Sequence, residues 1–124
     1  MGQKGLTGIP RLIAAFGNSV AGIKVCWRQE EAFRQEIYVL MLAIPMGIWL
    51  GDDGVERSML IGSVLLIAIV ETLNSAVEAV VDRIGDEYHE LSGYAKDIAS
   101  AGVLLSNFLA LMVWGLIAYD KLPG

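Results

Sequence analysis

The sequence predicts an all-α membrane protein with an N-terminal amphipathic surface helix followed by three transmembrane helices. Hydrophobic residues make up 55% of the 124 residues and charged residues only 19%. Soluble domains average about 45–50% apolar and about 25% charged residues. Three long apolar stretches carry the excess, and each is of a length that can cross a bilayer as a helix. The length of the chain allows a single small domain over residues 1–124.

Residues 6–35 are expected to form the surface helix. Their apolar residues recur at spacings of 4, 3, 4, 3 and 4, which is typical of one helical face: Ile9, Ile13, Phe16, Val20, Ile23 and Trp27. Four basic residues accompany this face: Arg11, Lys24, Arg28 and Arg34. Such a helix usually lies in the membrane interface, and packing of the same face on other protein helices is a compatible alternative. The first eight residues hold no apolar core, so a removable signal peptide is not expected.

The three spans are expected over residues 32–50, 58–81 and 98–119. Pro45 lies inside the first span and is expected to bend it. Polar, glycine-containing segments join the spans at residues 51–57 and 82–97. The third span has 22 residues without a charge, and its aromatic residues Trp114 and Tyr119 are typical of the membrane interface.

The distribution of Lys and Arg predicts the orientation. Five of these residues precede Ile37, one lies in 51–58, two lie in 82–97 and one follows residue 119. Because positive residues concentrate on the cytoplasmic side, the N-terminus and the 82–97 segment are expected to be cytoplasmic.

Four polar residues follow the second apolar stretch at spacings of three, four and four: Glu71, Asn74, Glu78 and Asp82. On a helix they fall within an arc of roughly 80°, and we call this set the acidic stripe. A carboxylate at membrane depth costs a few kcal/mol, so it usually marks function. The alternatives are hydrogen bonding between helices for Glu71 and Asn74, and solvation or helix capping for Asp82.

A second acidic set, Glu30, Glu31 and Glu36, lies in the stretch QEEAFRQE. Two carboxylates from separate helices together with phosphate oxygens suit Mg²⁺. Glu30 with Glu78 fits this pattern and leaves Glu71 free to take a proton.

Several classes of function are excluded by composition and motifs. The chain has one cysteine and one histidine, which rules out an internal disulfide and a structural zinc site built from three His or Cys ligands. A net charge of −5 with scattered basic residues argues against nucleic acid as a partner. The phosphate-binding loops of soluble kinases and nucleotidases are absent from the sequence, so nucleotide chemistry requires another framework.

Three stretches closely resemble the prokaryotic diacylglycerol kinase family: EAFRQE (31–36), VETLNSAVEAVVDRIG (70–85) and EYHELSGYAKDIASA (87–101). The resemblance extends from Arg11 to the third span. It implies a small homotrimeric enzyme of phospholipid metabolism in the bacterial inner membrane, multi-pass and with a cytoplasmic N-terminus. Members transfer the γ-phosphoryl group of MgATP to diacylglycerol and form phosphatidic acid.

The resemblance also implies roles for individual residues. Glu71 would be the catalytic base, with Asn74 supporting it, and Glu30 and Glu78 would hold the Mg²⁺ that accompanies ATP. The positions that bind ATP correspond to Arg11, Asn18, Glu30, Glu78, Glu87, Tyr88, His89, Lys96 and Asp97. The positions that contact the lipid substrate correspond to Arg11, Trp49, Glu71, Ser100 and Trp114. The family's site lies between subunits, which implies that the chain acts with copies of itself.

The chain departs from the family pattern at Ala14 and Ala21, where members often carry basic residues, and at Asn18, where they often carry an aromatic residue. These differences affect how the nucleotide and the lipid headgroup are held near the surface helix. Three other functions stay open: an undecaprenol kinase of the same family, an ion or proton carrier that uses the same carboxylates, and a structural membrane subunit. An ion carrier predicts ion flux without ATP consumption, and a structural subunit predicts tolerance of Glu71→Gln.

Overall fold

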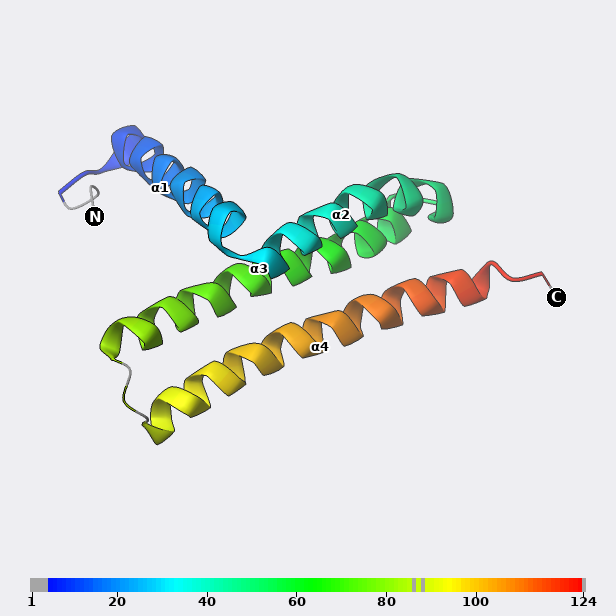
Figure 1. The fold of residues 1–124 in the computed structure, drawn as a ribbon. Helices are drawn as coiled ribbons and strands as arrows, with labels where there is room; N and C mark the ends of the chain where they lie inside the picture. The colour runs from blue at the N-terminus through cyan, green and yellow to red at the C-terminus, as the bar shows by residue number, and fades with distance from the viewer. Residues whose placement is uncertain (1–4, 86, 88, 124) are drawn as a thin grey trace.

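The computed structural model describes residues 5–85, 87 and 89–123, which form four α-helices (Figure 1). These are α1 (Gly8–Gln29), α2 (Glu31–Leu50), α3 (Gly54–Ile84) and α4 (Glu90–Asp120). The predicted all-helical class is confirmed. By length and composition, α2, α3 and α4 are each able to cross a membrane, which fits a multi-pass membrane protein.

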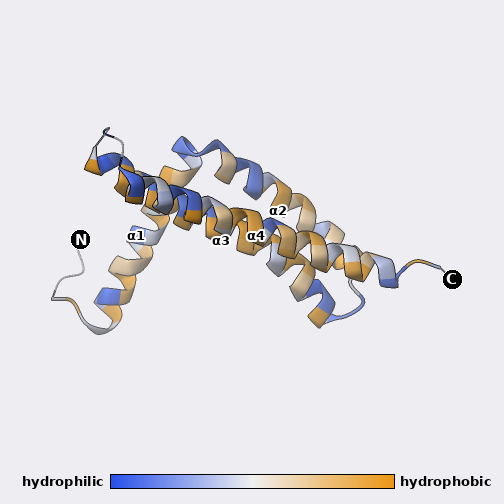
Figure 2. Cartoon of the chain, turned by 90° about the horizontal axis from the view of Figure 1, so that it is seen from below, coloured by the Kyte–Doolittle hydropathy of each residue, from blue (hydrophilic) through white to orange (hydrophobic). Residues whose placement is uncertain are grey.

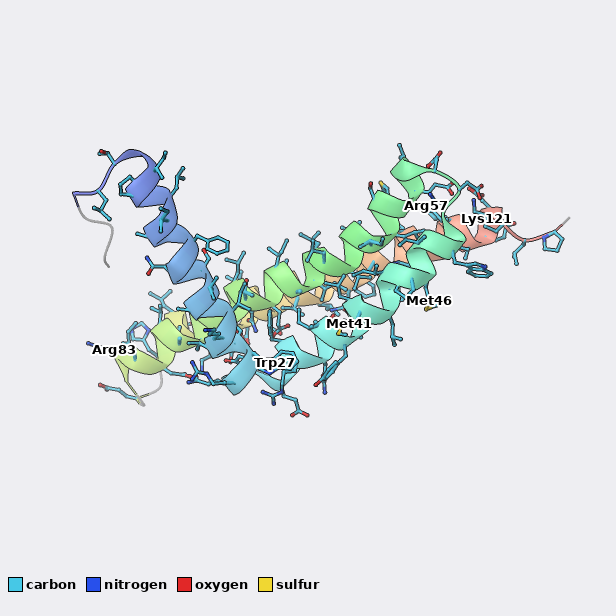
Figure 3. The ribbon with its side chains drawn as sticks, turned by 90° about the horizontal axis from the view of Figure 1, so that it is seen from above. Trp27, Met41, Met46, Arg57, Arg83 and Lys121 are labelled. Atoms are coloured by element: carbon cyan, nitrogen blue, oxygen red, sulfur yellow. The ribbon has the colours of Figure 1, made fainter. Side chains whose placement is uncertain are left out.

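Helix α3 lies between α2 and α4 and packs against both, while α1 turns away from this bundle (Figure 1). Arg57 and Lys121 lie at one end of the bundle and Arg83 at the other, with Trp27 near the corner between α1 and α2 (Figure 3). Hydrophilic residues gather where α3 gives way to α4 and at the start of α2, whereas the middle of the bundle is mostly hydrophobic (Figure 2).

The core lies along the face of α3 that meets α2 and α4. Its buried apolar side chains are Phe33, Ala43, Leu60, Val64, Ile67, Ala68, Ala110 and Val113. Gly47 allows α2 to approach α3 closely, because a Cβ atom there would lie 2.9 Å from Cγ1 of Ile61. Helix α4 is tied to α3 by the indole Nε1 of Trp114, which donates to the carbonyl of Leu60 at 2.9 Å.

The region predicted as one surface helix over residues 6–35 is divided at Glu30. This residue has an extended backbone, with φ −117° and ψ 104°, so α1 ends before it and α2 begins after it. The guanidinium of Arg34 stabilises the end of α1, because Nη1 donates to the carbonyls of Trp27 at 2.6 Å and Arg28 at 3.3 Å. The rings of Trp27 and Tyr38 then meet edge to face across the corner, with centroids 5.7 Å apart.

The polar connector expected over residues 82–97 is shorter in the structure, because α3 continues to Ile84 and α4 already begins at Glu90. Two interactions explain the extra helical turns. His89 caps α4 by accepting a hydrogen bond from the backbone N–H of Leu91 at Nδ1, 3.1 Å away. Asp82 and Lys96 form an ion pair of 2.7 Å between the two helices. Helical structure therefore extends beyond the apolar segments that the hydropathy pattern marks.

Candidate functional site

The acidic stripe lies along one side of the C-terminal half of α3. Glu71 is only 6% exposed, which is unusual for a carboxylate. One turn further, the side-chain amide of Asn74 donates from Nδ2 to Oε1 of Glu78 at 2.8 Å, and both residues are half-buried. The amide of Asn74 also lies close to the Glu71 carboxyl group. Asn74 therefore links Glu71 and Glu78, two of the three carboxylates of the stripe.

Glu30 approaches the stripe from the corner between α1 and α2. Its charge and that of Glu78 both act on Glu71, so each of these two carboxylates lies within electrostatic range of Glu71. Cys26 on α1 faces the same region. Burial raises the pKa of the Cys26 thiol above its ordinary value of 9.0, and the negative charges of Glu30 and Glu71 raise it further. The extended backbone of Glu30 thus turns a carboxylate from outside α3 toward the stripe.

A divalent cation is compatible with these side chains only if other ligands complete its shell. Across residues 5–85, 87 and 89–123, no group of three or more His, Cys, Asp or Glu side chains is placed to hold a metal ion. Glu30 and Glu78 offer two carboxylates from separate segments. Mg²⁺ is commonly bound by one or two carboxylates while phosphate oxygens and waters supply the remaining positions. The donor set therefore fits a cation that arrives with a nucleotide.

Helix α4 brings a cation to the end of the stripe. Nζ of Lys96 lies 2.7 Å from Oδ1 of Asp82 and is also near enough to Glu78 for their charges to attract. His89 lies at the start of α4, and its Nδ1 is occupied by the capping hydrogen bond. Glu87 and Asp97 are exposed near the same end of the bundle. Tyr88, which was predicted to bind the nucleotide, lies outside the described residues.

Arg11 and Asn18 lie at exposed positions of α1. Arg11 is separated from the end of α1 by about 27 Å at the rise of an α-helix. Helix α1 leads away from the bundle, and Arg11 lies near its start, on the part farther from the corner with α2 (Figure 1).

A cavity of about 380 Å³ lies between α2, α3 and α4. Glu36, Asn107 and the indole of Trp114 bring polar atoms to its lining. The rest of the lining is apolar: Val39, Leu42, Ala43, Met46, Val64, Ile67, Ala110 and Leu111. Glu36 is close enough to Glu71 for their charges to interact. Trp114, in contrast, is hydrogen-bonded to the carbonyl of Leu60. Leu60 precedes Glu71 by about 16 Å along α3. The cavity, which we call the interhelical groove, therefore runs from the region of Glu71 toward the other end of the bundle.

Sequence reasoning placed Trp114 among lipid contacts but did not predict Glu36 as a site residue. The signal for Glu36 was its spacing of three and seven residues from Val39 and Ala43, which puts it on the face of α2 that lines the groove. Trp49, at 82% exposure, and Ser100, also exposed, do not line it. Both point away from the protein core, where membrane lipid or another copy of the chain would meet them.

Comparison with known proteins identifies one family. The family model described as prokaryotic diacylglycerol kinase matches residues 17–118. The chain is 50% identical over 114 residues to the diacylglycerol kinase of Escherichia coli (strain K12), covering 92% of this chain and 93% of that protein. It is 45% identical over 113 residues to the diacylglycerol kinase of Haemophilus influenzae, covering 91% and 96%. It is 41% identical over 114 residues to the diacylglycerol kinase of Pseudomonas aeruginosa, covering 92% and 93%.

Proposed function

Because the chain belongs to the prokaryotic diacylglycerol kinase family, we propose that it transfers the γ-phosphoryl group of ATP to the free hydroxyl of diacylglycerol and forms phosphatidic acid. The observation that carries this proposal beyond the family is the burial of Glu71 beside the other carboxylates of the site. Phosphoryl transfer depends mainly on positioning and on charge compensation, and the arrangement of the stripe supports both.

Glu71 is the proton acceptor in this proposal. Its carboxylate receives the proton of the lipid hydroxyl as the oxygen–phosphorus bond forms. Low exposure keeps bulk water from Glu71, which favours transfer to the lipid over hydrolysis of ATP. Asn74 holds Glu78 by its hydrogen bond and keeps the carboxylates at fixed places along α3.

The nucleotide binds at the cytoplasmic end of the stripe. Glu30 and Glu78 would hold Mg²⁺ together with the phosphates of ATP, and the cation would supply positive charge that offsets that of the phosphate oxygens. Lys96 adds a positive charge at the same end. Glu87, Tyr88, His89 and Asp97 belong to the segment that receives the rest of the nucleotide.

The lipid approaches from the bilayer. The interhelical groove is apolar over most of its length and offers a place for an acyl chain whose glycerol end lies near Glu71. Trp114 forms part of its wall, and its indole N–H is already satisfied by Leu60, so the ring presents an apolar surface. Trp49 and Ser100 contribute lipid contacts outside the groove.

The enzyme acts as a homotrimer in the bacterial inner membrane, with the N-terminus and the α3–α4 connection in the cytoplasm. Two observations support a shared site. Large apolar side chains along all three spans are exposed in the single chain, and part of this surface is available to other copies. Helix α1, which carries Arg11, leads away from the bundle, and in this proposal a neighbouring subunit supplies this arginine (Figure 1).

The test is lipid-dependent release of ADP by the purified protein in mixed micelles with MgATP. Wild type, Glu71→Gln and Glu56→Gln are compared with a short-chain diacylglycerol, with undecaprenol and without lipid. Glu56→Gln is the matched control, because it makes the same chemical change at the opposite end of α3. Turnover on diacylglycerol that falls by at least two orders of magnitude only in Glu71→Gln supports the proposal.

Other outcomes contradict it in different ways. A preference for undecaprenol assigns the sister activity on the same site. Turnover that survives Glu71→Gln removes the proposed base. Folded protein without turnover on either lipid, combined with ion flux into vesicles, identifies a carrier instead of a kinase.

A further inference from the structure

The ion pair between Asp82 and Lys96 links the last turn of the acidic stripe to α4. The Nζ–Oδ1 distance is 2.7 Å, and the side chains of Lys96 and Asp82 are 43% and 64% exposed. Asp82 follows Glu78 by four residues and so lies on the same side of α3. The pair therefore joins the last residue of the stripe to α4 at the proposed cytoplasmic end of the bundle.

Lys96 needs an anchor to contribute a charge at a defined place. A lysine carries its ammonium group on a flexible four-carbon chain, and a half-exposed lysine without a partner samples many rotamers in solvent. Two carboxylates act on Lys96: Asp82 in direct contact and Glu78 at longer range. Glu78 already accepts a hydrogen bond from Asn74 and, in the proposed function, also holds the metal. Asp82 is left as the carboxylate that fixes the position of the ammonium group.

We propose that Asp82 is a positioning residue that holds Lys96 where the phosphate groups of the bound nucleotide need a cation. The inference rests on the proposed function and adds to it a residue that touches neither substrate. It differs from a simple brace between two helices, because the contribution of Asp82 to nucleotide binding then acts entirely through Lys96. Removal of Asp82 should therefore matter only while Lys96 is present.

The experiment is a double-mutant cycle on the full-length protein in mixed micelles. ADP release is measured against ATP concentration at saturating diacylglycerol for wild type, Asp82→Asn, Lys96→Met and the double variant. Asp82→Glu keeps the charge and tests rescue. Glu56→Gln is the matched control, since it weakens another lysine–carboxylate contact, that of Lys121, at the opposite end of the bundle. The melting temperature of each variant is recorded, and Asp82→Ala replaces Asp82→Asn if the latter does not fold.

We expect Asp82→Asn to raise the KM for ATP about two- to fivefold, the range of a partly exposed ion pair, with kcat changed less than KM. Asp82→Glu restores most of the loss, and Asp82→Asn has no further effect in the Lys96→Met background. Glu56→Gln leaves both constants unchanged.

Three results overturn the inference. The first is an equal rise in KM in the presence and absence of Lys96, and the second is a loss of melting temperature with KM unchanged. The third is the same rise in KM for Glu56→Gln. A wild-type protein without lipid-dependent turnover instead refutes the proposed function itself, so the two failures are distinguishable.

Discussion

The close approach of α2 to α3 at Gly47 allows a sharp test of packing. A Cβ atom at this position would lie 2.9 Å from Cγ1 of Ile61, 3.4 Å from Cβ of Leu60 and 3.5 Å from Cδ1 of Ile61. Carbon atoms pack best at about 3.5–4.0 Å. Gly47→Ala therefore forces α2 away from α3 or displaces Ile61. Overpacking of this kind costs about 1–3 kcal/mol.

Two other glycines serve as controls that separate the overpacking cost at Gly47 from the change in helix propensity. Alanine is favoured over glycine in a helix by up to about 1 kcal/mol, which would mask part of the cost at Gly47. Gly62 and Gly115 also lie in spans, and a Cβ atom at either meets nothing within 4 Å. Because the gain in helix propensity is shared, the difference in unfolding free energy between Gly47→Ala and these controls should be about 1–3 kcal/mol.

Unfolding in mixed micelles of increasing denaturing detergent, followed by far-ultraviolet circular dichroism, measures this difference. Ala43 and Met46 precede Gly47 on α2 and line the interhelical groove. Because Gly47→Ala displaces this part of α2, it should also raise the KM for lipid. A Gly47→Ala variant at least as stable as both controls would refute the close approach of α2 and α3.

Three further substitutions test other contacts. Trp114→Phe removes the donor to the carbonyl of Leu60. The free energy of unfolding in the same assay should fall by about 0.6 kcal/mol, the average that double-mutant cycles give for interhelical hydrogen bonds in one well-studied membrane protein. No change in this free energy would contradict the hydrogen bond. Lys121→Met removes the contacts of the residue that follows α4 with Asp52 and Glu56. These carboxylates raise the pKa of Lys121 above its ordinary value of 10.5, so their contribution to stability should be constant from neutral pH up to 10.5 and be lost as the pH rises through the raised pKa. Equal melting temperatures of wild type and variant at neutral pH would contradict this. The pH dependence of the reaction of Cys26 with maleimide should give an apparent pKa above 9.0. Glu30→Gln should lower that pKa only in part, because burial is the larger cause of the shift. A thiol that titrates below 9.0 would contradict the placement of Cys26.

Much of the fold could be predicted because its signals are local. Apolar length gives the spans, and the spacing of Glu71, Asn74 and Glu78 gives a stripe on one face of α3, since both depend on the geometry of a single helix. The ends of the helices were less predictable. The polar residues between 82 and 97 read as a connector, yet the cap at His89 and the contact of Asp82 with Lys96 continue the helices through most of them.

Contacts between helices could not be predicted, because periodicity defines a face but not the register against a neighbour. The bond from Trp114 to Leu60, the approach of Glu30 to the stripe and the position of Glu36 in the groove all depend on that register. The resemblance to the family supplied candidate roles for residues such as Arg11. It did not show that α1, which carries Arg11, leads away from the bundle.

The corner between α1 and α2 consists of a single non-helical residue, Glu30. Because this junction is a single residue, it cannot absorb an insertion or a deletion without a change in one of the two helices. One inserted residue would turn the carboxylate by about 100° and shift it by about 1.5 Å if either helix absorbed it. During evolution a substitution near the corner can be compensated by a neighbouring side chain, but an insertion or deletion there redirects an entire helix. The length of this junction should therefore be more constrained than its composition.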